Sequence, residues 1–198
     1  MKNNALARLL ITLLTPILIV APATAQVPVP QTPDATLNIV SAPFCDAIED
    51  STGATTYRLE AFYTVEETGH MVYFEVDGVE TFDLTTVTVT YSDAATGASL
   101  GWMTVDSTSR VETRLTEMGQ ALPESVVASF STVLANEQVT AAVATDCAAA
   151  KPCKRPGKLF AQILCLAASV TACVWLPTFC PALGPTIYSA CYNSICEN

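Results

Sequence analysis

Histidine is the scarcest functional side chain in this 198-residue sequence, since His70 is the only one. A zinc site built from cysteine and histidine needs ligands clustered at short spacings, and no two of the eight cysteines follow the C-x2-C spacing of a zinc knuckle. The sequence also lacks a calcium loop, with its alternating oxygen ligands, and a glycine-rich phosphate loop. It therefore predicts neither a metal ion nor another cofactor.

A catalytic serine is the next function that the sequence argues against. The segment Gly97-Ala98-Ser99-Leu100-Gly101 matches the G-x-S-x-G pattern of α/β-hydrolases, in which a strand precedes the serine and a helix follows it. Here a polar loop precedes Ser99, a strand-like segment follows it, and His70 comes before the serine instead of after it. We expect a glycine-bounded hairpin loop at this position, and we expect that the protein is not an enzyme.

Basic residues are scarce in residues 26–146, and acidic residues are scarce in residues 147–198. Residues 26–146 contain three basic and 18 acidic residues, a net charge of −15, whereas residues 147–198 contain four basic residues and one acidic residue. Cysteine changes at the same boundary, because Cys45 alone precedes it and seven of the last 52 residues are cysteine, ~13%, as in disulfide scaffolds. The sequence thus predicts an acidic domain at 36–146 and a basic, cysteine-rich domain at 147–198. The acidic domain would repel nucleic acid, so no nucleic-acid partner is expected.

The first 25 residues have the three parts of a secretory signal peptide. Lys2 and Arg8 precede an apolar run over residues 9–20, and a small-x-small cleavage site ends at Ala25. A retained anchor is the alternative, but the apolar run is short for a membrane span. Residues 26–35 form a proline-rich spacer. Cleavage after Ala25 would leave a secreted protein in an oxidising environment, where disulfides persist.

The acidic domain is expected to be an antiparallel β domain with one packed helix. β-branched and aromatic residues, in several places alternating with polar ones, predict strands within 54–66, 70–76, 80–91, 99–105 and 109–115. Residues 67–69 and 77–78 are expected to form hairpin turns, and residues 93–97 a longer loop. Apolar residues at helical spacing predict a helix within 122–138, and residues 139–145 suit a closing strand.

The segment from Leu159 to Cys180 contains no charged residue, which raises the question of a membrane span. As a helix its first 18 residues would extend ~27 Å, slightly less than the ~30 Å hydrocarbon core. After an exported domain, such a span would also place the preceding basic residues outside, against the usual bias. We therefore expect a buried helix ending near Leu176, followed by a second helix from Pro185, in a small disulfide-stapled α-helical hairpin domain. The predicted fold class is α+β.

Eight cysteines allow four disulfide bonds. A bond between Cys45 and Cys147 would clasp the two ends of the acidic domain. The other six cysteines then pair in one of 15 ways: Cys153, Cys165, Cys173, Cys180, Cys191 and Cys196.

The junction between the two predicted domains carries three basic residues that suit proteolytic processing, namely Lys151, Lys154 and Arg155. A cut after Lys151 leaves an even number of cysteines on each side, whereas a cut after Arg155 leaves odd numbers. Parity therefore favours the cut after Lys151, and we expect processing at the junction near Asp146–Lys151.

The C-terminal segment CKRPGKLFAQILCLAASVTACVWLPTFCPALGPTIYSACYNSIC resembles the C-terminal peptide of halocin C8-like bacteriocin precursors. The shared features are a cysteine-rich apolar core, a Leu-Gly-Pro-Thr turn and a closing helix with an Ala-Cys pair and a final cysteine. The resemblance implies a peptide released from a secreted precursor whose N-terminal part binds it and confers immunity. This sequence differs from the family in lacking a twin-arginine signal and a close cysteine pair near the start of the core.

The expected function is therefore that of a precursor of an antimicrobial, bacteriocin-like peptide. A basic, apolar peptide adsorbs to anionic membranes, and an attached acidic domain would shield or neutralise it. The expected partners are the target-cell membrane and the acidic domain of the same chain. Two alternatives remain open: an uncleaved exported envelope or binding protein with a structural cysteine-rich module, and a protein tethered to a membrane by its C-terminal segment.

Overall fold

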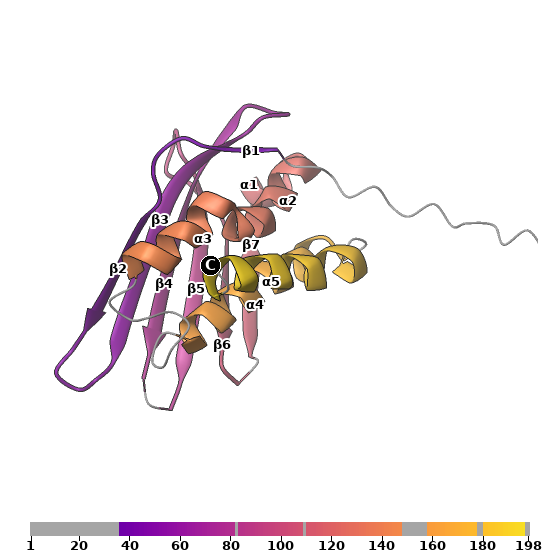
Figure 1. Cartoon of the computed structure of the whole chain (residues 1–198). Coiled ribbons are helices and arrows are strands. Elements are labelled where there is room, and N and C mark those ends of the chain that lie inside the picture. Colours follow the sequence, from indigo (N-terminus) through magenta and orange to yellow (C-terminus); the bar gives the residue numbers. More distant parts are fainter. Residues whose placement is uncertain (1–35, 82, 109, 148–157, 178–179, 197–198) are drawn as a thin grey trace, which may run out of the picture.

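The computed structural model describes residues 36–196, apart from residues 82, 109, 148–157 and 178–179. Its centre is a seven-stranded antiparallel sheet in the order β1-β3-β4-β5-β6-β7, with β2 pairing beside β1 on the outer edge of β3 (Figure 1). The strands are β1 (Leu37–Ile39), β2 (Phe44–Glu49), β3 (Thr55–Val65), β4 (His70–Glu80), β5 (Thr85–Asp93), β6 (Ser99–Asp106) and β7 (Val111–Leu115).

All the longer helices cover one face of this sheet (Figure 1). The helices are α1 (Glu117–Gln120), α2 (Glu124–Thr132), the 3-10 turn η1 (Val133–Ala135), α3 (Glu137–Thr145), α4 (Lys158–Trp175) and α5 (Cys180–Cys196). Helix α4 lies directly on β4, β5 and β6, whereas α5 packs mainly against α4, α3 and η1. The molecule is therefore an α+β structure with a layer of helices on an antiparallel sheet.

Strict alternation along β3 and β4 produces the two faces of the sheet. In β3, Tyr57, Leu59 and Tyr63 are fully buried on the helix-covered inner face, while Arg58 and Phe62 are exposed on the outer face. Successive side chains of a strand point to opposite faces, so the apolar face of each strand contributes to one core. The antiparallel sheet and the five strands predicted from the sequence are confirmed.

The two-stranded edge at β1 and β2 was not predicted. Strand β1 has only three residues, which is too few for an alternating pattern. Strand β2 contains Asp46 and Glu49, residue types that are depleted in strands. Both strands form because β3 is long enough to pair with β1 near Val65 and with β2 near Thr55.

The predicted turn at Asp77-Gly78 is wrong. Both residues lie inside β4, where Gly78 is paired with Tyr57 on one side and Val87 on the other. Asp-Gly is a frequent turn sequence because glycine tolerates positive φ, but Gly78 is needed here for a different reason. The aromatic ring of Phe160 in α4 lies against its backbone, and a side chain would collide with that ring.

The predicted closing strand at 139–145 is also wrong, because these residues belong to helix α3. A short apolar run does not distinguish a strand from a buried helix, and its three alanines favour a helix. The side chain of Asn136 accepts a hydrogen bond from the Gln138 amide and caps the helix. The expected helix within 122–138 is present as α2 and η1, so more than one helix packs on the sheet.

The helical hairpin predicted near the C-terminus is present, with one difference at its second helix. Helix α4 ends at Trp175, as expected, but α5 begins at Cys180 and contains Pro185 instead of starting there. Gly184 also lies inside α5, where a Cβ atom would lie 3.1 Å from the sulfur of Cys173. This glycine permits close packing of the two helices.

The hairpin shares its hydrophobic core with the sheet. One cluster of buried residues extends from Tyr57 and Val89 on the strands to Leu164 on α4 and Ile195 on α5. The division into folding units at 36–146 and 147–198 stays a prediction. In the part of the chain that the structure describes, no helix has the length and apolarity needed to cross a membrane.

The packing predicts the cost of removing Phe130. Its fully buried ring stacks on Tyr91 at 4.3 Å and contacts the edge of Trp175. We expect Phe130→Ala to lower the free energy of unfolding by about 3–5 kcal/mol, measured by urea denaturation of the oxidised chain. The matched control is Phe62→Ala on the outer face, where 38% of Phe62 is exposed and the expected loss is about 1 kcal/mol. Equal losses in the two variants would contradict this account of the core.

Candidate functional site

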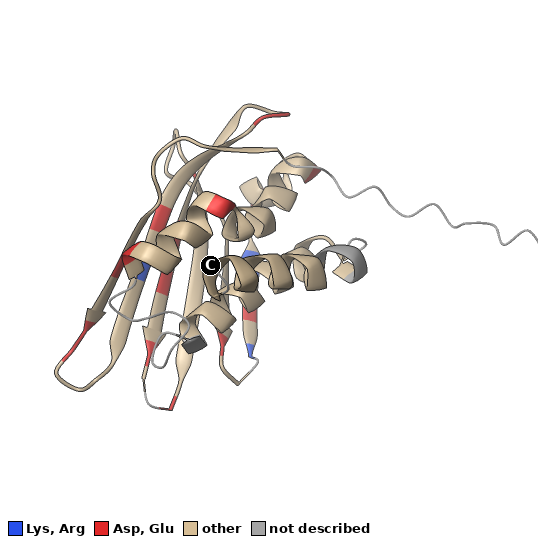
Figure 2. Ribbon diagram, viewed as in Figure 1, with Lys and Arg blue, Asp and Glu red and all other residues tan. Residues whose placement is uncertain are grey.

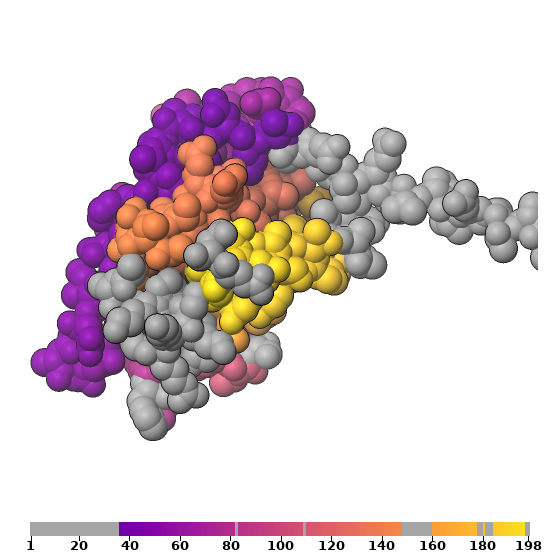
Figure 3. Space-filling view, viewed as in Figure 1, coloured from indigo at the N-terminus to yellow at the C-terminus, as the bar shows by residue number. Residues whose placement is uncertain are grey.

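Helix α4 of the C-terminal hairpin packs on the inner face of the sheet, and this contact forms part of the hydrophobic core. The side of α4 that faces the sheet is buried from Phe160 to Ala172. Its fully buried residues include Phe160, Ala161, Leu164, Cys165, Ala167 and Ala168. The space-filling view shows α5 lying against the earlier helices (Figure 3). We define the tail as residues 158–196 and the body as residues 36–147.

The first turn of α4 is fixed by an aromatic stack. The ring of Phe160 lies parallel to that of Tyr57, with centroids 4.0 Å apart and planes inclined by 5°. Both residues are fully buried, and the Tyr57 hydroxyl donates a hydrogen bond to Glu80 Oε2 at 3.1 Å. Burial raises the pKa of Tyr57 well above its usual range, and the neighbouring charge of Glu80 raises it further.

The last turn of α4 meets a second aromatic cluster. Trp175 presents an edge-on contact to Tyr91 at 6.0 Å and to Phe130 at 5.7 Å. The Tyr91 hydroxyl donates to the Phe130 carbonyl oxygen and thereby ties β5 to α2. Between the two clusters, the Thr171 hydroxyl lies 3.4 Å from the sulfur of Met103 on β6. The helix is thus held at both ends by aromatic rings and along its middle by small side chains.

The tail brings no charged side chain to this contact, and the buried carboxylate beside Tyr57 belongs to Glu80 of the body. The chain has no charged residue from Phe160 to Cys196, and Figure 2 shows the acidic residues on the strands and on the helices of the body. Attraction between body and tail therefore rests on apolar burial over these residues. Such a contact is not weakened by salt as exposed ion pairs are.

The described disulfides fall on one side or the other of the junction between body and tail. Cys45 is bonded to Cys147 within the body, while Cys165–Cys191 and Cys173–Cys180 join α4 to α5 within the tail. Cys196 is also disulfide-bonded. The remaining predicted site residues, Ala25, Lys151, Cys153, Lys154 and Arg155, lie outside the described residues.

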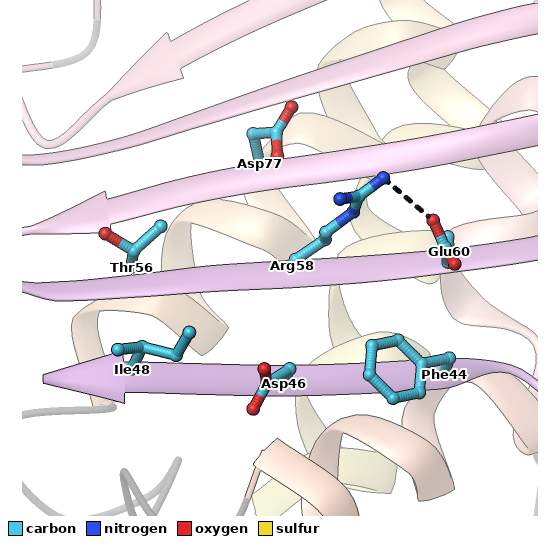
Figure 4. A pocket seen from close by; sticks show the side chains of 7 residues that line it. All are labelled: Phe44, Asp46, Ile48, Thr56, Arg58, Glu60 and Asp77. Carbon is cyan, nitrogen blue, oxygen red and sulfur yellow. Dashed lines mark ion pairs between the residues drawn. The ribbon is translucent and has the colours of Figure 1, made fainter.

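The outer face of the sheet carries a shallow hollow of about 460 Å³ (Figure 4). Arg58 lies across it, 3.2 Å from Glu60 and 2.8 Å from Glu75. Asp46 and Asp77 occupy the positions beside Arg58 on the neighbouring strands, and Phe44 and Ile48 are exposed at the rim. The hollow is open to solvent, and its arginine is already paired with carboxylates, so it has the features of a solvated sheet surface.

The G-x-S-x-G segment has the geometry of a hairpin. Gly97 has a φ of 70° in the turn between β5 and β6, and Ser99 is the first residue of β6. A strand follows the serine, so the expected glycine-bounded hairpin loop is confirmed and the hydrolase elbow is not formed. His70 is the first residue of β4. Among the described residues, no three histidine, cysteine, aspartate or glutamate side chains are grouped to hold a metal ion.

Comparison with known proteins gives no match from which a role for these residues could be taken. The chain matches no family model, no curated protein and no solved structure.

Several residues of the body–tail contact were missed by the sequence analysis. Tyr57, Gly78, Phe160 and Trp175 had been assigned to strands, a turn or an apolar run without a common role. One signal was available: a glycine within a strand often marks the close approach of another group, and Gly78 follows an alternating run.

Three buried tyrosines predict a loss of stability in alkali. Burial raises the pKa of Tyr57, Tyr63 and Tyr91 above the usual value of about 10. Above pH 10 the unfolded chain loses these protons before the folded chain does, so the free energy of unfolding falls by about 1.4 kcal/mol per pH unit for each tyrosine. Urea denaturation between pH 9 and 12 measures this slope. Tyr63→Phe should reduce the contribution of these three residues by about a third, and an unchanged slope would contradict the assignment.

The pairing of the cysteines predicts the outcome of non-reducing peptide mapping. We expect linked peptides for Cys45–Cys147, Cys165–Cys191 and Cys173–Cys180. Parity leaves Cys153 as the expected partner of Cys196. Trypsin has no cleavage site within residues 159–198, so chymotrypsin and elastase are required. A bond from Cys45 or Cys147 to a cysteine of the tail would contradict the separation of the two sets.

Proposed function

We propose that the chain is a secreted precursor of a disulfide-rich antimicrobial peptide. In this proposal the tail acts on target-cell membranes after cleavage at the junction, and the acidic body shields or neutralises it before release. The resemblance to halocin C8-like bacteriocin precursors and the predicted signal peptide at 1–25 agree with it. Several disulfides are also typical of extracellular proteins.

The observation that carries the proposal is the combination of buried apolar surface and separate disulfides. The apolar side of α4 is covered by the sheet, so the intact chain does not offer it to a lipid surface. The described bonds of the tail, Cys165–Cys191 and Cys173–Cys180, remain intact when the junction is cut. A cut between Cys147 and Cys153 therefore turns a covalent connection into a non-covalent one while the hairpin keeps its crosslinks.

Release would expose a surface that suits a membrane interface. The face of α4 that now contacts the sheet is apolar, and the tail contains no acidic residue between Phe160 and Cys196. Lys158 at its start, and Lys154 and Arg155 in the segment released with it, would add attraction to anionic lipid. Apolar burial and electrostatic attraction together determine the binding strength of such peptides.

A second candidate is an uncleaved exported envelope or binding protein with a structural cysteine-rich module. The observation in its favour is that body and tail share one hydrophobic core. Loss of the tail would uncover Val76, Val89 and Met103 on the sheet, which are now fully buried. In this reading the tail is a permanent layer of the fold.

Mass spectrometry of the secreted material separates the two candidates. The precursor is expected to give two components whose masses place the cut between Cys147 and Cys153, each with its disulfides formed. Recovery of the intact mature chain alone would favour the uncleaved protein.

Growth inhibition tests the proposed activity directly. The purified chain is compared before cleavage, after cleavage at Lys151, and after cleavage followed by reduction. We expect the cleaved, oxidised material to inhibit susceptible cells at a concentration at least about tenfold lower than the intact chain, because only then does the apolar face of α4 reach lipid. Reduction should abolish the activity. Equal activity of the intact and cleaved chains would contradict shielding by the body.

A further inference from the structure

Gly78 occupies a position in β4 where a glycine is otherwise unfavourable. It is the ninth of eleven residues in the strand and is paired on both sides, with Tyr57 of β3 and with Val87 of β5. Glycine weakens a strand, because it gains no side-chain packing and loses more chain entropy than other residues. Its presence inside a paired strand therefore points to a close contact at this position.

The ring of Phe160 makes that contact. A Cβ atom at position 78 would lie 2.5 Å from Phe160 Cε2 and 2.7 Å from Cδ2, well inside van der Waals contact. The same ring stacks on Tyr57, which is directly opposite Gly78 in the register. Tyr57 and the backbone of Gly78 thus form a recess that accepts a flat ring. The ring of Phe160 fills this recess and is fully buried.

We propose that this recess is the specificity-determining contact by which the body recognises its tail. The proposal rests on the proposed function in treating the tail as a partner that the body must bind. The partner that fits is a helix with a planar aromatic side chain in its first turn, followed by small residues that allow the helix to lie close to the strands. Helix α4 provides this combination in Phe160, Ala161, Ala167 and Ala168.

A second glycine on the inner face shows that the recess is particular to Gly78. A Cβ atom at Gly101 of β6 would meet Leu115 at 2.9 Å and the Arg114 carbonyl oxygen at 3.0 Å, both in β7. Its distance to Trp175 of the tail would be 3.5 Å, an ordinary contact. Gly101 therefore serves the packing of the sheet edge, whereas the group that excludes a side chain at Gly78 belongs to the tail.

Hydrogen exchange on the intact, oxidised full chain tests the proposal without requiring cleavage. In Gly78→Ala the added methyl group displaces the Phe160 ring, so we expect the α4 amides to exchange at least about tenfold faster while β5 and β6 remain protected. In the matched control Gly101→Ala, we expect faster exchange in β6 and β7 and less than about a threefold change in α4. Unchanged α4 exchange in Gly78→Ala, or an equal effect of both variants on α4, would overturn the proposal.

Combining the substitutions shows whether the two residues act through one contact. We expect Phe160→Ala alone to accelerate α4 exchange, and Gly78→Ala combined with Phe160→Ala to add less than about a further threefold, because contacting residues are not additive. Multiplication of the two single effects would overturn the proposal. If Gly78→Ala does not fold, recovery of a folded chain in the double variant supports the same contact, and its failure to fold overturns it. These measurements are independent of growth inhibition, so absence of antimicrobial activity would refute the proposed function and leave the recess intact.

Discussion

The covering of the sheet's inner face by α4 is the contact on which the rest of the structure depends. The strands form a continuous apolar surface that includes Val76, Val89 and Met103, and it is fully buried in one core with residues of the tail. Conversely, α4 is a strongly apolar helix whose sheet-facing side needs cover. Burial of apolar area dominates folding energetics. The body and the tail therefore stabilise each other by covering each other's apolar surface.

Local patterns accounted for the strands and the hairpin because both depend on residues that are near one another in sequence. Alternation located β3 to β7, and the uncharged run from Leu159 located α4. The error at Asp77-Gly78 arose where a distant residue matters, whereas the error at 139–145 arose because a short apolar run suits either a strand or a helix. Glycine suits position 78 of β4 because the ring of Phe160, 82 positions later, occupies the space of a side chain. Gly184 likewise lets α5 approach Cys173 of α4 closely. No short-range rule contains that information.

The sequence indicated the boundary between body and tail, but not the residues that form the contact between them. Cysteine parity and the change in charge at 146 indicated two sets of bonds and a junction between them. The aromatic contacts of Tyr57, Tyr91 and Trp175 with their partners join three strands or helices that are far apart in the sequence. Their partners become evident only when the topology has placed β3, β5 and α4 together.

The bond between Cys45 and Cys147 also determines how the molecule carries mechanical load. It closes a covalent ring that contains nearly the whole sheet, since the two cysteines are 102 positions apart. Tension applied between the two chain ends passes along β1, through this bond and into the segment after Cys147. The hydrogen-bonded ladder from β3 to β7 lies within the ring and outside that path, so β1, which pairs with β3, is the strand that bears the force.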